Sequence, residues 1–151
     1  MSYDDACSTF HVRHAWLSLR GLVADELTGH QLSVAQFASL LMLEKSPGLT
    51  VADVARAVST ARQSANEMLG GLEQAGLVER RPHPTDRRSQ QVFLTEAGRA
   101  RLAEALPTVQ ALEARLSAGF TPEQLAVVDA WLTRMIQAAS VPGAPEEIAT
   151  I

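Results

Sequence analysis

One predicted helix, residues 60–74, carries the side chains best suited to chemistry. At about 100° per residue, its polar and apolar residues separate onto opposite faces, so that one face can enter a core and the other can contact a partner. Guanidinium and amide groups on the polar face are of the kinds that pair with guanine and adenine edges in a duplex groove. The polar face holds Arg62, Gln63, Asn66, Glu67 and Gly70, and the apolar face holds Ala61, Ala65, Met68, Leu69 and Leu72.

A second group of basic side chains lies in a predicted two-stranded hairpin, residues 77–81 and 89–94. The loop between these strands contains two prolines, which stiffen it, and it presents Arg87 and Arg88. Arginines at the tip of a stiff loop can reach a neighbouring minor groove, where A·T-rich stretches concentrate negative potential. The hairpin and the helix therefore predict one basic surface.

Several of these residues also have a purely structural interpretation. Gln63 could cap its own helix together with Thr60 instead of contacting a base. Arg80 and Arg81 could be strand-surface charges rather than phosphate contacts. Asp86 could be an ion-pair partner that holds the hairpin loop, since no second carboxylate or nucleophile accompanies it to suggest catalysis.

Periodicity and helix-start signals divide the rest of the chain. Apolar spacing predicts a long first helix over residues 7–27. Capping patterns predict further helices that begin after Ser33, Thr50, Thr95 and Thr121. The last helix is expected to bury Leu125, Val128, Leu132 and Met135 or Ile136.

Composition limits the class of protein. The chain has 151 residues, 46% hydrophobic and 20% charged, which suits one soluble domain with a helical extension and excludes a multidomain enzyme. Aromatic residues are scarce at 5% and runs of β-branched residues are nearly absent, so a mostly helical fold with a small sheet is expected. The single cysteine excludes a disulfide framework within one chain and a zinc finger that needs two thiolates.

The same sequence predicts a cytoplasmic protein. No apolar run approaches the ~18 residues of a membrane helix, so no membrane partner is expected. The first residues are acidic, where a secretory signal would be basic.

The formal net charge of −4 is unevenly distributed. Residues 56–101 hold eight arginines and five acidic residues, a net charge of +3, and the remainder of the chain has a net charge of −7. A local positive surface can bind phosphates while acidic helices elsewhere keep the protein soluble, so the total charge does not exclude a nucleic-acid partner. A chance grouping of solvated arginines is the alternative.

The order of these elements predicts a winged helix-turn-helix, mostly α with a small β-hairpin. Two stretches resemble the MarR family of bacterial transcription regulators. Residues 86–98 fit the family's wing, with Asp86, Arg88, Leu94-Thr95 and Gly98 at the expected places, and residues 72–80 fit the end of its recognition helix and first wing strand. The order and approximate lengths of the elements agree from about residue 8 to 139.

The resemblance implies a ligand-responsive repressor that binds a pseudo-palindromic operator as a homodimer. Residues 1–30 and 95–140 would form the helical dimerisation region, residues 31–94 the DNA-binding lobe and residues 141–151 a tail. Glu67 departs from the family, which often has a basic or neutral residue there. Carried over by position, the DNA-binding residues are Thr60, Arg62, Gln63, Ser64, Asn66, Arg80, Arg81, Arg87 and Arg88, with Asp86 orienting the wing.

The first helix carries two candidate sensor sites. Cys7, His11 and His14 are spaced i, i+4, i+7 and share one face, which leaves open a redox thiol, a metal site that lacks a fourth ligand, or an inert interface cysteine. Neither a metal nor another cofactor is assigned. Arg13, His14, Trp16 and Arg20 could line the cleft in which the family takes up aromatic or phenolic acids, although a Trp at this place is also a common core residue.

The sequence leaves one preferred function and two alternatives open. The preferred interpretation is a sequence-specific DNA-binding regulator, and Glu67 and the acidic total favour the alternative of a winged-helix protein-interaction module without DNA binding. A Cys7-based redox-sensing regulator is a third alternative. An enzyme is not expected, because no Ser-His-Asp set, glycine-rich phosphate loop or pair of carboxylates is present.

Overall fold

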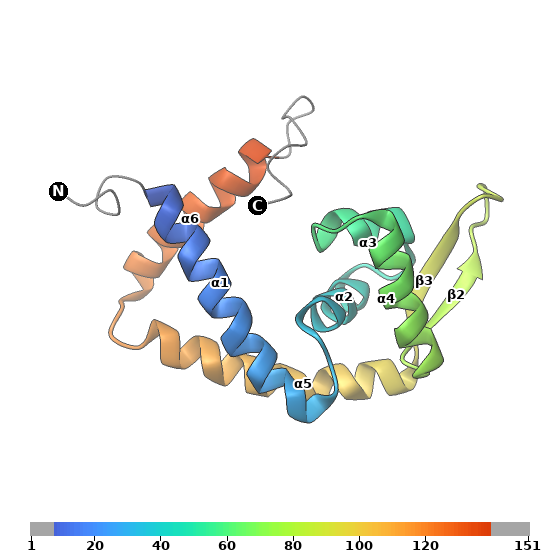
Figure 1. Ribbon diagram of the computed structural model, residues 1–151, viewed down its shortest axis with the longest axis horizontal. Coiled ribbons are helices and arrows are strands. Elements are labelled where there is room, and N and C mark those ends of the chain that lie inside the picture. The colour runs from blue at the N-terminus through green and yellow to red at the C-terminus, as the bar shows by residue number, and fades with distance from the viewer. Residues whose placement is uncertain (1–7, 140–151) are drawn as a thin grey trace. The chain divides into compact units, whose positions relative to one another are not determined.

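The computed structural model describes residues 8–139 (Figure 1). The described chain is mostly helical with a small antiparallel sheet, as the sequence predicts. No described helix is both long and apolar enough to cross a membrane. The elements are α1 (Ser8–Leu27), the 3-10 helix η2 (Thr28–His30), α2 (Val34–Lys45), β1 (Leu49–Thr50), α3 (Val51–Ala57), α4 (Arg62–Gln74), β2 (Val78–Pro82), β3 (Gln90–Leu94), α5 (Glu96–Ser117) and α6 (Pro122–Ala139).

Packing divides the chain into two compact units, of which the first ends at Leu112 and the second begins at Glu113. The core of the first unit is apolar and is shared by α2, α3, α4, the sheet and the first turns of α5. In Figure 1, α4 runs alongside the β2–β3 hairpin, whose tip extends past the helix. The largest fully buried side chains are Leu27, Leu40, Leu43, Leu69, Leu72, Val54, Val78 and Val92.

The predicted capping boxes form at α2 and α3. Ser33 Oγ accepts the Gln36 N–H at 3.1 Å, and the Gln36 side chain accepts the Ser33 N–H at 2.9 Å. Thr50 and Asp53 make the same reciprocal pair at α3, where the Thr50 hydroxyl also donates to Asp53 Oδ2 at 2.7 Å. This last hydrogen bond is the main reason that the pKa of Asp53 lies below its ordinary value.

The prediction that Thr60 begins the next helix is wrong. The N-cap of α4 is Ala61, which is exposed and makes no side-chain cap hydrogen bond. Ser59 has a positive φ of 52°, and the N–H of Thr60 donates to Ala55 O at 2.9 Å. The backbone of Thr60 therefore completes the C-terminal cap of α3, and α4 begins after it.

The C-terminal end of α4 is capped by Gly76, as the sequence predicts. Gly76 has a φ of 72°, and its N–H donates to Glu73 O at 2.9 Å. The N–H of Leu77 donates to Leu72 O at 2.9 Å, which completes a Schellman cap. This turn directs the chain from the end of α4 into β2.

The sheet has three strands in the order β1-β3-β2, where the sequence predicts only a two-stranded hairpin. β1 contributes two residues, with Leu49 opposite Val92 and Thr50 opposite Gln91. Two residues are too few to show an alternating pattern, so β1 leaves no signal that sequence reasoning could detect.

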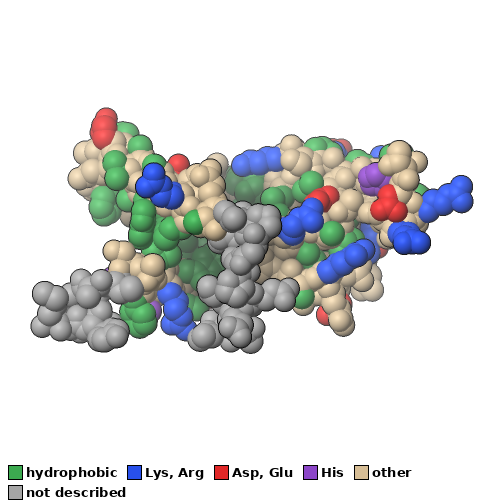
Figure 2. All heavy atoms as spheres, turned by 90° about the horizontal axis from the view of Figure 1, so that it is seen from above, with side chains coloured by type: hydrophobic (Ala, Val, Ile, Leu, Met, Phe, Trp, Pro, Cys, Tyr) green, Lys and Arg blue, Asp and Glu red, His purple; other side chains and the backbone are tan. Residues whose placement is uncertain are grey.

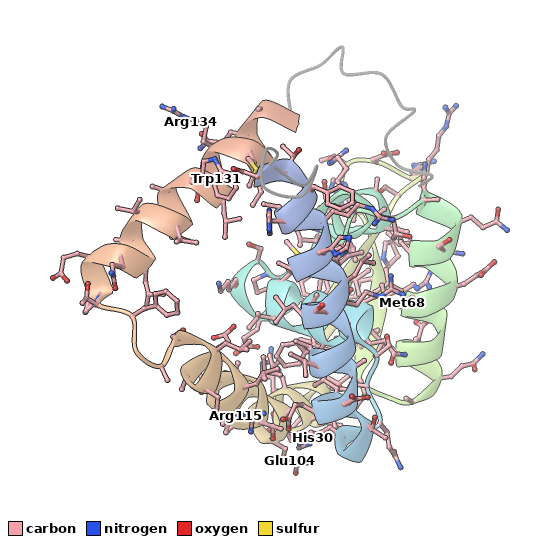
Figure 3. All side chains as sticks on the ribbon, turned by 60° about the vertical axis from the view of Figure 1, so that its left-hand side comes forward. His30, Met68, Glu104, Arg115, Trp131 and Arg134 are labelled. Atoms are coloured by element: carbon pink, nitrogen blue, oxygen red, sulfur yellow. The ribbon has the colours of Figure 1, made fainter. Side chains whose placement is uncertain are left out.

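The start of α5 is fixed against the end of α4. Thr95 Oγ1 donates to Gly76 O at 2.6 Å and accepts the Gly98 N–H at 3.0 Å. A Cβ on Gly98 would lie 2.0 Å from Leu77 O, so only glycine permits this approach. Farther along the helix, His30 Nε2 lies 3.0 Å from Thr108 Oγ1, where Figure 3 shows His30 beside α5.

The second unit contains α6, which begins with the predicted capping box of Thr121 and Gln124. The expectation that α6 buries its apolar stripe is wrong for the single chain: Leu125, Val128 and Leu132 are 37%, 48% and 38% exposed. Trp131, labelled in Figure 3, is 40% exposed. The spacing predicts correctly which residues share a face of α6, but it does not specify whether the same chain covers that face.

Candidate nucleic-acid interface

A hollow of about 620 Å³ lies between the first half of α4, the start of α3 and the loop end of the β2–β3 hairpin. Four arginines and no acidic residue line it, so its potential is positive. In Figure 2, basic side chains extend from the right-hand side, where the hairpin lies, with acidic and histidine side chains among them. The lining residues are Val51, Ala52, Arg62, Gln63, Asn66, Arg80, Arg87, Arg88, Ser89 and Gln90.

The first two turns of α4 supply three of the predicted site residues. Arg62, Gln63 and Asn66 are exposed and line the hollow. Arg62 forms no ion pair with any residue that the structure describes. Gln63 Nε2 donates to Glu67 Oε1 at 3.3 Å, so Gln63 does not cap the helix.

Arg80, on β2, is tied to the side of α4. Its Nη1 donates to Asn66 Oδ1 at 2.7 Å, and its Nη2 donates to the Asn66 carbonyl oxygen at 3.0 Å. Its Nε lies 3.4 Å from Glu73 Oε2, and only 14% of the side chain is exposed. Arg80 is thus neither a plain surface charge nor a free phosphate ligand.

Arg81 lies on the opposite face of β2, because side chains alternate along a strand. It pairs with Glu79, and its guanidinium carbon lies 4.5 Å from the centre of the Phe93 ring. It does not line the hollow. Of these two neighbouring arginines, both predicted to bind DNA, only Arg80 lines the hollow.

The loop of the hairpin is held by side-chain acceptors for backbone N–H groups. Asp86 Oδ1 accepts the Arg88 N–H at 2.9 Å, and none of the ion pairs between described residues involves Asp86. His83 Nδ1 accepts the N–H groups of Thr85 at 3.3 Å and Asp86 at 3.1 Å. Asp86 thus shapes the loop through the backbone rather than through an ion pair. The sequence analysis does not assign this role to His83, although its place before Pro-Thr-Asp is typical of a turn residue.

The two loop arginines are available for a ligand. Arg87 and Arg88 are exposed. Neither guanidinium group forms an ion pair with a residue that the structure describes. Of the other predicted contacts, Thr60 and Ser64 are exposed but lie outside the hollow. The structure thus brings together six of the predicted DNA-binding residues: Arg62, Gln63, Asn66, Arg80, Arg87 and Arg88.

The predicted effector residues all lie on α1. Arg13, His14, Trp16 and Arg20 are exposed, and Trp16, at 54% exposed, is not a core residue in the single chain. The His14 ring stacks at a tilt on Phe10, with 4.7 Å between ring centres. Cys7 lies outside the described residues. Within residues 8–139, no group of three His, Cys, Asp or Glu side chains could hold a metal ion.

Comparison with known proteins identifies relatives that regulate transcription. The sequence pattern described as "MarR family" matches residues 30–89. An HTH-type transcriptional repressor of Mycobacterium tuberculosis is 36% identical over 121 residues, which cover 80% of this chain and 87% of the repressor.

Solved structures of the same kind share the fold. The transcriptional repressor CouR, bound to a 23-mer DNA duplex, is 29% identical with a TM-score of 0.81, and the match covers 89% of this chain and 96% of CouR. A MarR family regulator from Silicibacter pomeroyi is 26% identical with a TM-score of 0.81, covering 93% of this chain and 94% of that protein. These similarities extend well beyond the helix-turn-helix.

Proposed function

The chain belongs to the MarR family and is a DNA-binding transcriptional regulator rather than an enzyme, and on this basis we propose that it acts in the cytoplasm as a homodimeric operator-binding repressor. α4 would enter the major groove of each half-site and the β2–β3 wing the neighbouring minor groove. A signal would release the repressor from its operator.

The observation that carries this proposal is the set of unpaired cations around the hollow. Arg62, Arg87 and Arg88 have no acidic partner among the described residues, although acidic residues outnumber basic ones over the whole chain. Like charges held close together without partners cost free energy, and phosphate oxygens would remove that cost. Gln63 and Asn66 lie among these cations and supply groups that can read base edges.

Dimerisation would place two such surfaces side by side. Successive half-sites in the major groove are ~34 Å apart, so an effector that changes the spacing of the two α4 helices would lose one half-site. An aromatic or phenolic acid near Arg13, His14, Trp16 and Arg20 is the effector class that we propose, since an arginine would attract its carboxylate and a Trp face would stack on its ring.

The test is DNA binding as a function of salt. Affinity for duplex DNA should fall steeply as salt rises, because each phosphate contact releases counterions. Arg88→Ala and Arg62→Ala should each lower operator affinity by about 1–3 kcal/mol, and a variant that loses a phosphate contact should also reduce the salt slope by about 1. Fluorescence anisotropy on fragments selected from random duplexes measures both quantities.

Arg99→Ala is the matched control, because it removes the same charge from an arginine that pairs with Glu44 and lies outside the hollow. If Arg88→Ala binds DNA with wild-type affinity, the wing does not contribute to the complex. If binding is weak and insensitive to salt, the protein-interaction module without DNA binding, which Glu67 favours, replaces the repressor. Intact peroxide response in Cys7→Ser would exclude the redox-sensing alternative.

A further inference from the structure

Arg80 and Asn66 make a direct contact between the wing and α4. The guanidinium makes two hydrogen bonds to this one residue, 2.7 Å to Oδ1 and 3.0 Å to the backbone oxygen. Arg80 comes from β2 and Asn66 from the exposed face of α4, so the contact joins the wing to α4.

The surroundings hold Arg80 in this place. Asn66 and Glu73 are two turns apart on α4 and share a face, and Nε of Arg80 lies 3.4 Å from Glu73 Oε2. Gly70 lies between them and has no side chain, so the guanidinium can lie across the helix, with Nη2 3.8 Å from the position of an added Cβ. The Arg80 side chain is largely buried there.

This contact fixes the orientation of the Asn66 amide. A guanidinium group only donates hydrogen bonds, so the amide atom that faces it must be the oxygen. The NH2 group of Asn66 is then the outward group, and it has no hydrogen-bond partner among the residues that the structure describes. The chemistry of the partner settles which atom is which, independently of how the amide is drawn.

We propose that Arg80 is a positioning residue that turns Asn66 into a hydrogen-bond donor for guanine. The proposal rests on the proposed function. Guanine offers two acceptors in the major groove, N7 and O6, to which the NH2 group can donate. Adenine offers the NH2 group only one acceptor, N7, because its N6 amino group is a donor and would compete with Arg80 for the amide oxygen. Asn66 should therefore select a G·C pair, although Asn is usually paired with adenine.

The experiment selects bound duplexes from a random pool and compares the full-length wild type with Asn66→Ala. The position whose base preference disappears in Asn66→Ala is the one that Asn66 reads, and the wild type should prefer G·C over A·T there by about tenfold. Replacing that guanine by 7-deazaguanine, which lacks the N7 acceptor, should weaken wild-type binding and leave Asn66→Ala unaffected. A preference for A·T, or no position that depends on Asn66, overturns the proposal.

Arg80→Met tests the positioning role, and Arg81→Met is its matched control. Both variants lose one positive charge from β2, but only the first frees the Asn66 oxygen. Arg80→Met should reduce the ratio of G·C to A·T affinity at this position by about tenfold, whereas Arg81→Met should leave the ratio unchanged. An unchanged ratio in a folded Arg80→Met variant contradicts the proposal.

Asn66→Asp keeps the inference testable if Arg80→Met fails to fold. Aspartate retains an acceptor for Arg80 but has no NH2 group, so the melting temperature should be kept and the sensitivity to 7-deazaguanine lost. Retained sensitivity to 7-deazaguanine in Asn66→Asp overturns the proposal. If the wild type binds no duplex selectively, the proposed function fails as well; selective binding without a G·C preference at this position overturns only the inference.

Discussion

The arginines of the wing differ in their partners, and the partners determine their roles. Arg88 has no ion-pair partner in the described chain, Arg80 is held by Asn66 and Glu73, and Arg81 pairs with Glu79 on the other face of the strand. Helical periodicity places Arg62 and Asn66 on one face, because that pattern is local. The Arg80–Asn66 contact joins residues 14 apart in sequence and depends on how β2 packs on α4, which no local pattern specifies.

Asp86 provides a test of how the wing loop is shaped. Its Oδ1 accepts the Arg88 N–H, which a neutral amide oxygen can also do. Asp86→Asn should therefore bind operator DNA almost as the wild type does, whereas Asp86→Ala should lose about 1 kcal/mol of binding free energy because the backbone at Arg88 is freed. Anisotropy titrations at one salt concentration measure the difference. Equal losses in both variants would instead indicate that the charge of Asp86 is what matters.

At the scale of helices and strands, sequence signals are reliable where residues a few positions apart satisfy them within one helix. The capping boxes at Ser33, Thr50 and Thr121 formed because each pairs residues three apart. The prediction that Thr60 begins α4 is wrong because its backbone N–H donates to Ala55 O and completes the cap of α3. The helix α4 therefore begins after Thr60. The strand β1 was missed because it is too short to show a pattern.

The capping box of α3 makes a pH-dependent contribution to stability. Because hydrogen bonds from Thr50 lower the pKa of Asp53 in the folded state, the ionised carboxylate favours folding. Asp53→Ala should cost about 1 kcal/mol at pH 7. This difference from the wild type should persist above about pH 4, the range of an unfolded carboxyl, and be lost as pH falls through the lower folded pKa.

Urea unfolding from pH 7 to pH 3 measures this difference. Asp25→Ala is the control, since Asp25 is an exposed acidic residue that forms no cap. Its effect should remain within about 0.5 kcal/mol at each pH. A cost of Asp53→Ala that stays constant down to pH 3 would show that the ionised carboxylate does not stabilise α3.

Gly98 fixes the junction between α4 and α5. Gly98→Ala would place a methyl group 2.0 Å from Leu77 O, a backbone atom that cannot move without disturbing the end of α4. We expect a loss of about 2–3 kcal/mol in unfolding free energy. Gly71→Ala is the control on α4, because its Cβ would meet only Gln36 Nε2, at 4.0 Å, and it should gain about 0.5–1 kcal/mol. Thermal melts of both variants compare them directly, and a neutral Gly98→Ala would show that the junction can open.

At the scale of the whole molecule, α6 exposes an apolar face that the sequence assigned to a core. Leu125, Val128 and Leu132 follow helical spacing and are all at least 37% exposed in the single chain. Exposure of contiguous apolar side chains is costly in water, and a second copy of the chain would cover them. Sequence periodicity could identify this face but could not specify which surface covers it.

The proposed dimer can be tested by placing charges on the apolar face of α6. Val128→Glu combined with Leu132→Glu places two carboxylates on this face, and each should cost the dimer at least about 2 kcal/mol. The double variant should sediment as a monomer and lose most of its operator affinity, because a monomer engages only one half-site. Val127→Glu is the control: Val127 is 71% exposed and lies on the opposite side of α6, so the dimer and its DNA binding should be retained. If the double variant remains dimeric by analytical ultracentrifugation and binds with wild-type affinity, the α6 face is not the interface, and the two reading surfaces must be paired through another part of the chain.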